Sequence, residues 1–311
     1  MQNTLSDAEK ELLELLIQNS RYTPAIIGKT IGKSRNWVSR KIKTLVTKEV
    51  IRSYTTIVDP VQIKAARDTI LFMKSNPREQ DVSKNLLKME ELESLDGVAG
   101  EFSLIGFFRF DSQGAFEDLL DRVDSVVASS GAGKYNLVQV LTTYKKNRFK
   151  ITSEATESHL SSKDLALLRI IRRQIPTPAK PYPLTQEAIG KRMATPMRQP
   201  AVSKTIEKLL IKKAIVGYSI DIDFSLIGLP VKFFVRMKVS PGSSGETAQR
   251  LVDMDEVWDL YRTSEDYTLF ATVRTESIES FNRFLRKLYE NENVLDTHSY
   301  VSLEEWFVLA H

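Results

Sequence analysis

A short basic stretch near the start of the chain carries residue types that contact nucleic acid. Between residues 33 and 48 there are six Lys or Arg and no Asp or Glu. Ser34 has a hydroxyl that can cap the start of a helix. Val38, Ile42 and Leu45 then recur at helical spacing, which predicts a buried face. The polar and basic residues fall largely on the other side: Arg35, Asn36, Ser39, Arg40, Lys41 and Lys43.

These side chains suit the major groove of DNA. Arg can donate to the edge of guanine and Asn can pair with the edge of adenine, while Lys neutralises phosphate. A helix with an apolar back and this front therefore predicts base and phosphate contacts. A basic face that is merely solvated is the alternative interpretation.

The residues before this helix predict a helix-turn-helix. Ser6 and Glu9 have the spacing of a capping box, and the apolar residues that follow predict a helix that ends near Asn19. Thr23-Pro24 predicts the start of a second helix, because proline is favoured at the first helical position. After the basic helix, residues 50–60 alternate and are rich in β-branched residues, which predicts a hairpin wing.

Composition bounds the class of protein. The 311 residues predict two or more domains, and 42% hydrophobic and 27% charged residues are ordinary for a soluble globular protein. The absence of cysteine excludes disulfides and thiolate chemistry. No apolar run has the length of a membrane helix, and the first residues lack the bases of a signal peptide, so we expect a cytoplasmic protein with no membrane partner.

Charge is segregated along the chain. The net charge is +4 over residues 1–60 and +7 over 161–223, but −2 over 61–160 and −5 over 224–311. The two basic segments are therefore candidates for contact with a polyanion.

Residues 61–150 predict a ferredoxin-like domain. The apolar patterns give the order strand, helix, strand, strand, helix, strand. The predicted elements are 70–75, 81–92, one or two strands within 100–110, 115–127 and 136–144. Such a sheet has one bare face, which needs a partner sheet.

A polar linker is predicted at 145–158, and the pattern then repeats. Leu12-Leu13 corresponds to Leu167-Leu168, and Ile27-Gly28-Lys29 to Ile189-Gly190-Lys191. The offset between the halves grows from 155 to 164 residues. The predicted DNA contacts of the second copy are Arg198, Gln199, Ser203 and Lys204. Pro200 near its start and Glu207 in place of Lys43 predict weaker or different DNA binding by this copy.

Residues 5–60 resemble the N-terminal domain of the Lrp/AsnC regulators, in which an effector-binding ferredoxin-like domain follows. The resemblance implies an α+β chain with two winged helix-turn-helix domains, 1–60 and 151–223, alternating with two ferredoxin-like domains, 61–150 and 224–311. Family members pack their sheets face to face, which here implies an internal pseudo-dimer. The positions that correspond to the family's effector turn are Gly106, Phe107, Ser264 and Asp266, and they depart from its Gly-x-x-Asp-like pattern.

The predicted function is a sequence-specific transcription regulator that binds double-stranded DNA, with a small-molecule effector and homo-oligomers as further partners. His159, His298 and His311 lack metal-ligand spacing, and we expect no metal, cofactor or catalytic residue. One alternative is a siroheme-decarboxylase-like tetrapyrrole enzyme of the same architecture, against which we expect no cluster of His, Arg and Tyr in the middle strands. Another is an interaction scaffold that does not bind DNA.

Overall fold

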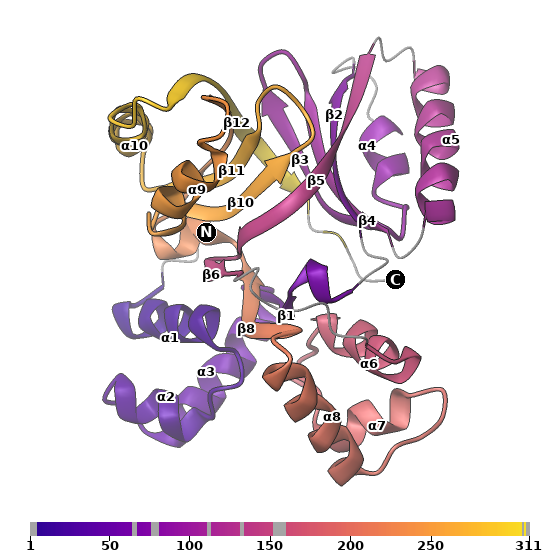
Figure 1. Ribbon diagram of the computed structural model, residues 1–311. Coiled ribbons are helices and arrows are strands. Elements are labelled where there is room, and N and C mark those ends of the chain that lie inside the picture. Colours follow the sequence, from indigo (N-terminus) through magenta and orange to yellow (C-terminus); the bar gives the residue numbers. More distant parts are fainter. Residues whose placement is uncertain are drawn as a thin grey trace. The chain divides into compact units, whose positions relative to one another are not determined.

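The computed structural model describes residues 5–63, 67–75, 81–110, 113–130, 134–151, 160–306 and 308. It divides into two compact units, each built from both halves of the sequence (Figure 1). Unit 1 contains the described residues of 5–63 and 160–230, and unit 2 those of 67–151 and 231–308. His159 and His311 and the predicted linker after residue 151 lie outside the described residues.

Unit 1 holds two sets of three helices around a small sheet. The first set is α1 (Asp7–Gln18), α2 (Pro24–Thr30) and α3 (Arg35–Thr47). The second set is α6 (Ser162–Arg172), α7 (Gln186–Arg192) and α8 (Gln199–Ile211). The sheet has the order β7 (Arg173–Gln174), β1 (Ile51–Val58), β8 (Ile215–Ile222). Two short 3₁₀ turns follow the long strands, η1 (Pro60–Gln62) and η2 (Phe224–Ile227).

The predicted helices of the first set form for the predicted reasons. Glu9 accepts hydrogen bonds from the backbone amide and the hydroxyl of Ser6, as expected of the capping residues. Thr23 accepts from the amide of Ile26, with Pro24 in the first turn. Ser34 accepts from the amide of Trp37 at the start of α3. These side-chain oxygens satisfy amides that the first helical turn leaves unpaired.

The hairpin predicted for residues 50–60 is wrong. Residues Ile51–Val58 form one continuous strand, β1, which pairs antiparallel with β8 and, through Tyr54 and Thr55, with β7. Both partners lie more than 100 residues away in the sequence. The alternating pattern was that of a strand, but it carried no information about which strand lies beside it.

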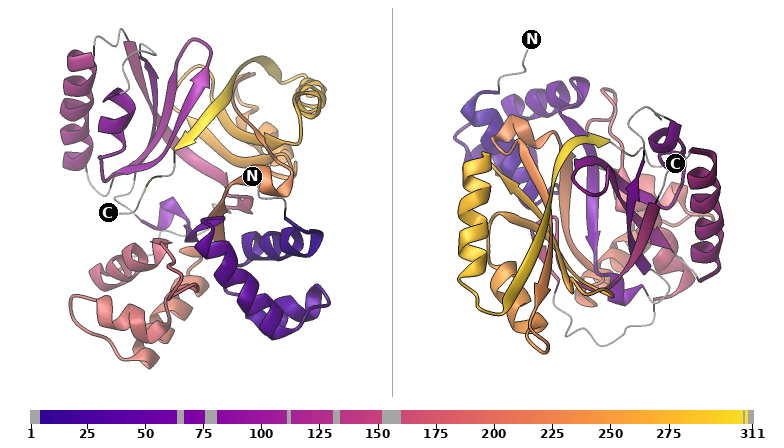
Figure 2. Two further views of the ribbon diagram at one scale, coloured as in Figure 1. Left: turned by 180° about the vertical axis from the view of Figure 1, so that it is seen from behind. Right: turned by 90° about the horizontal axis from the view of Figure 1, so that it is seen from above.

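Unit 2 is built on a β-barrel-like sheet of nine strands. Its first half contributes β2 (Arg67–Lys74), β3 (Leu92–Ala99), β4 (Leu104–Phe110), β5 (Lys134–Lys146) and β6 (Phe149–Lys150). Its second half contributes β9 (Val231–Val239), β10 (Val257–Thr263), β11 (Leu269–Thr275) and β12 (Val294–Trp306). The order is β10-β11-β9-β12-β3-β4-β2-β5-β6, and a further pairing of β10 with β5 closes it (Figure 2).

Four helices lie on the outside of this sheet: α4 (Asp81–Leu86), α5 (Gln113–Ser130), α9 (Ser244–Val252) and α10 (Ile278–Tyr289). The helix predicted for 81–92 therefore ends at Leu86, and β3 begins at Leu92. The strand predicted for 136–144 runs from Lys134 to Lys146, and β6 lies within the predicted linker.

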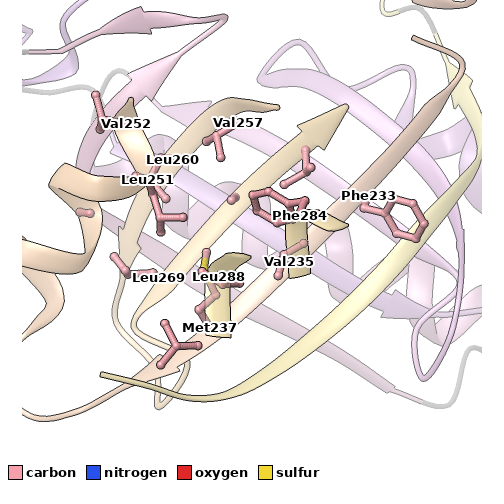
Figure 3. Packing of buried hydrophobic residues seen from close by; sticks show 14 of the residues in the cluster. Phe233, Val235, Met237, Leu251, Val252, Val257, Leu260, Leu269, Phe284 and Leu288 are labelled. Carbon is pink, nitrogen blue, oxygen red and sulfur yellow. The ribbon is translucent and has the colours of Figure 1, made fainter. Parts of the chain in front are cut away.

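Three apolar clusters fill unit 2. One packs the second-half strands against α9 and α10, with Phe233 stacked on Phe281 at a ring-centroid distance of 3.5 Å (Figure 3). A second packs the first-half strands against α4 and α5. The third lies between the strands of the two halves and is largely aromatic. It contains Phe72, Phe102, Phe107, Phe234, Tyr261, Phe270 and Tyr300.

Candidate nucleic-acid interface

Helix α3 is held by a buried back and a tight turn. Val38, Ile42 and Leu45 are at most 1% exposed. The turn from α2 brings the backbone so close to Gly28 that a Cβ there would lie 2.5 Å from the carbonyl oxygen of Lys33. Only glycine fits such an approach. In the second half, a Cβ on Gly190 would lie 2.1 Å from the carbonyl oxygen of Met197.

The front of α3 presents polar and basic side chains to solvent. Arg35, Asn36, Arg40 and Lys43 are exposed, and Ser39 is half-buried. Within the described part of the chain no ion pair joins Arg35, Arg40 or Lys43 to an acid. The helix itself contains four bases and no acid. These charges are therefore available to an outside anion.

Lys41 occupies a different environment. Its ammonium lies 2.9 Å from Oε1 of Glu9 and 5.7 Å from the centroid of the Trp37 ring. Burial raises the pKa of Glu9, but the hydrogen bonds from Ser6 and Lys41 outweigh it and lower that pKa to about 2. Lys41 therefore joins α3 to α1, which makes it a less suitable DNA contact than Arg40.

Helix α8 presents a different front. Arg198 is its exposed N-cap residue, and Lys204 and Glu207 are also exposed. The amide of Gln199 donates to Oε1 of Gln186 at 2.6 Å, and Gln186 in turn donates to Ser203 at 3.5 Å. Two of the predicted contacts of the second copy are thus connected to α7, whereas the predicted contacts on α3 face solvent.

The second copy repeats the link between first and third helices with a different lysine. Lys208 of α8 forms an ion pair with Asp164, the acid of the α6 capping box. Lys41 and Glu9 are linked in the same way in the first copy. With the offset of 164 residues, Lys208 corresponds to Thr44 and not to Lys41, so the two basic partners lie about one turn apart on their helices.

The candidate effector residues lie in different surroundings. Phe107 is 7% exposed and packs among the aromatic residues between the sheets, and Gly106 precedes it on β4. Ser264 follows β10, where its hydroxyl accepts from the amide of Gln139 at 3.2 Å. Asp266 is exposed in the same turn. A filled aromatic core around Phe107 leaves its side chain little room for a ligand.

The expectation that the middle strands lack a cluster of His, Arg and Tyr is wrong. Arg236 of β9 donates to the hydroxyl of Tyr300 at 3.4 Å, and its guanidinium lies 4.8 Å from the ring centroid of Tyr267. Tyr267 lies 4.8 Å from the ring of His298, which pairs with Arg236 across β9 and β12. The pairing of β9 with β12, which are distant in sequence, brings these residues together.

Internal partners satisfy much of this cluster. Arg236 donates two hydrogen bonds to Glu265, at 2.7 and 3.0 Å. Burial lowers the pKa of Arg236, but its bonds to Tyr300 and Glu265 outweigh burial and raise it. Tyr267 donates to Asp296 at 2.5 Å, which raises the pKa of Tyr267 to about 12. The arginine is thus already paired with a carboxylate, as it would be with an acidic ligand.

No group of three or more His, Asp or Glu that could hold a metal ion occurs among the described residues. Nor does any helix in the described ranges have the length and apolar character needed to cross a membrane.

Comparison with known proteins points in two directions. The Lrp/AsnC ligand-binding domain model matches residues 232–307. The chain is 28% identical over 145 residues to the HTH-type transcriptional regulator LysM of Sulfurisphaera tokodaii, covering 46% of this chain and 95% of LysM. It is 27% identical over 125 residues to LrpA of Mycobacterium tuberculosis, covering 40% of this chain and 83% of LrpA. These matches support the Lrp/AsnC family.

A solved structure matches over nearly the full length. The siroheme decarboxylase NirDL superposes with a TM-score of 0.62 at 12% identity, covering 96% of this chain and 92% of NirDL. At this identity the likeness concerns the fold alone. The curated relatives are regulators and thus support a regulator over an enzyme, whereas this neighbour in fold is an enzyme.

Proposed function

We propose that the chain is a sequence-specific DNA-binding transcription regulator of Lrp/AsnC type, in which the first helix-turn-helix reads bases and the second assists. The observation that carries the proposal is the solvent-facing front of α3. Arg35, Asn36, Arg40 and Lys43 are exposed on a capped helix that contains no acid. Arg and Asn match guanine and adenine edges, and Lys matches phosphate.

The tandem organisation is part of the proposal. The division into domains 1–60, 61–150, 151–223 and 224–311 is supported by the repeated element order and by the two glycines, Gly28 and Gly190, that approach a following turn. The pairing of β1 with β8 and the aromatic cluster between the strands of unit 2 are contacts between the two halves that support an internal pseudo-dimer. Effector binding at Gly106, Phe107, Ser264 and Asp266 remains a prediction, as does oligomerisation of the whole chain.

The salt dependence of DNA binding tests the proposal. Each phosphate that the protein neutralises releases about 0.9 counterion from duplex DNA, so the affinity must fall steeply as salt rises. We expect a log–log slope of about −3 or steeper if three or more bases contact phosphates. The R35A/R40A/K43A variant should have a clearly shallower slope. A slope near zero for the unmodified chain would exclude DNA binding and favour an interaction scaffold.

A tetrapyrrole enzyme is the second candidate. The likeness in fold to NirDL, together with the cluster of Arg236, Tyr267, His298 and Tyr300, favours it. The ion pair of Arg236 with Glu265 and the filled aromatic core argue against it. An absorbance titration with iron-uroporphyrin III separates the two functions, because a bound tetrapyrrole shifts its absorbance maximum. We expect no saturable shift.

A further inference from the structure

We propose that one chain binds a directional, non-palindromic DNA site, in which α3 contacts one half-site and α8 contacts a different one at a fixed spacing. This inference rests on the DNA-binding function proposed above and adds the class of DNA site. It follows from three features of unit 1: a local two-fold axis, crosswise bonds between the halves, and unlike recognition helices.

The register of β1 and β8 defines the local two-fold axis. Thr55 pairs with Ser219, its own equivalent at the offset of 164 residues. At the two ends of the ribbon, Ile51 pairs with Ile222 and Val58 with Ile215. Adding 164 to either first-half residue gives the second-half residue of the other pair. The axis therefore passes through the pair of Thr55 and Ser219, and it relates the two helix-turn-helices as two-fold symmetry relates those of a dimer on DNA.

Bonds between the halves fix the two helix-turn-helices together. The hydroxyl of Ser219 in β8 donates to the carbonyl of Ile17 in α1 at 2.8 Å. The hydroxyl of Thr56 in β1 donates to the carbonyl of Ile171 in α6 at 2.7 Å. Both hydroxyls are buried, so breaking either bond would leave an unpaired polar group. Each strand thus braces the first helix of the other half.

Packing reinforces these bonds. Helix α1 contacts β8 and helix α6 contacts β1, as the arrangement around the two strands shows (Figure 1). Val58 from β1 also belongs to the apolar core of the second helix-turn-helix, beside Leu167 and Ile215. The two recognition helices are therefore joined by a packed sheet, and their spacing on DNA is set by it.

The two recognition helices cannot read the same half-site equally. Helix α3 has four bases and no acid, whereas α8 has Lys204, Lys208 and Glu207. Lys208 is paired with Asp164, and Gln199 with Gln186. At equivalent positions, Lys43 attracts phosphate and Glu207 repels it. Because the frame is nearly symmetric and the fronts are not, the preferred DNA must be asymmetric and read in one direction.

Site-directed DNA cleavage tests this orientation. Because the chain has no cysteine, one introduced thiol is a unique attachment point for an iron chelate. Ala25 and Glu187 are exposed second residues of α2 and α7, and they are equivalent at the offset of 162. The full-length A25C and E187C variants would be labelled and bound to a duplex selected by the unmodified chain from a random pool. We expect each label to cleave only one end of the site, and the two labels to cleave opposite ends.

Two further measurements complete the test. Sedimentation should give one chain per duplex, and palindromes made from either half-site should bind at least tenfold more weakly than the selected duplex. An insertion of about 5 base pairs between the half-sites turns them to opposite faces of the DNA and should reduce affinity by a similar factor. Cleavage at both ends by each label, or equal affinity for a palindrome, overturns the inference alone. A pool that yields no preferred duplex overturns the DNA-binding function and the inference with it.

Discussion

The ammonium of Lys41 lies 2.9 Å from the carboxylate of Glu9, so a base of the recognition helix is anchored to the first helix of its own half. The same carboxylate accepts the amide of Ser6 and completes the start of α1. One acid therefore serves both the end of a helix and the contact between two helices.

Glu9→Gln should lower the free energy of unfolding by about 1–2 kcal/mol at neutral pH, because it removes a charged partner of Ser6 and Lys41. The folded-state pKa of Glu9 is about 2, below its usual value of 4.5. This stabilisation is therefore complete above about pH 4.5 and is lost as the pH falls toward 2. Urea unfolding from pH 2 to 7 measures it. The exposed Glu11→Gln is the control and should change little.

Gly28→Ala should destabilise the chain by about 1–3 kcal/mol, because the new Cβ would meet a backbone oxygen that cannot move without shifting the turn. Gly190→Ala should do the same, since its calculated approach to Met197 is closer still. Gly245→Ala is the matched control, because nothing lies within 4 Å of its Cβ position in α9. Thermal unfolding of the three variants compares them, and a loss for Gly245→Ala as large as for Gly28→Ala would contradict the explanation.

Arg40→Ala should weaken binding to the preferred duplex by tenfold or more, since a good base contact contributes about 1–3 kcal/mol. Lys204→Ala should cost less, and Lys41→Ala should change DNA affinity least because its ammonium already has a partner. Asn36→Ala should relax sequence preference more than it lowers nonspecific affinity. Binding titrations on preferred and scrambled duplexes at one salt concentration test the ranking. Equal losses for Arg40→Ala and Lys204→Ala would show that the two copies contribute alike.

Glu207→Lys should strengthen nonspecific DNA binding, because Glu207 is exposed on the front of α8 and its carboxylate repels phosphate. The salt slope should steepen by about one for each new phosphate contact. Glu246→Lys, an exposed change in unit 2, has the same change in net charge and serves as the control. An equal gain from the control would mean that net charge alone explains the effect.

Asp96→Ala should destabilise unit 2 by about 3–5 kcal/mol, because it removes the main partner of a buried ammonium. Lys232 lies 2.8 and 3.0 Å from the two oxygens of Asp96, and both residues are under 10% exposed. The double variant D96L/K232M should recover most of the loss, since an apolar pair can replace a buried ion pair. Urea unfolding of the single and double variants measures the coupling, which should vanish if the ion pair contributes nothing.

Local chemistry made much of unit 1 predictable. Ser6, Glu9, Thr23 and Ser34 are hydrogen-bonding residues at helix starts, and their effects span only three residues along the chain. The strand at Ile51–Val58 was misjudged because its partner, β8, begins at Ile215. Alternation predicts a strand but does not identify its neighbour.

The same limit applies to the candidate sites. The exposed front of α3 follows from helical periodicity, so its outward residues could be named from the sequence. The cluster around Arg236 could not, because its members are separated by up to 64 residues and meet only through the pairing of β9 with β12. The bond of Lys41 to Glu9 depends on how α1 crosses α3, which no spacing within either helix specifies.

The pairing of β1 with β8 has a consequence for the abundance and evolution of the protein. Two separate subunits must meet before they can share a ribbon, so their assembly falls away on dilution, whereas this ribbon forms within one polypeptide at any copy number. Separate copies of one gene product must also carry identical substitutions. Here each half can change alone, and Lys43 opposite Glu207 is a record of that independence.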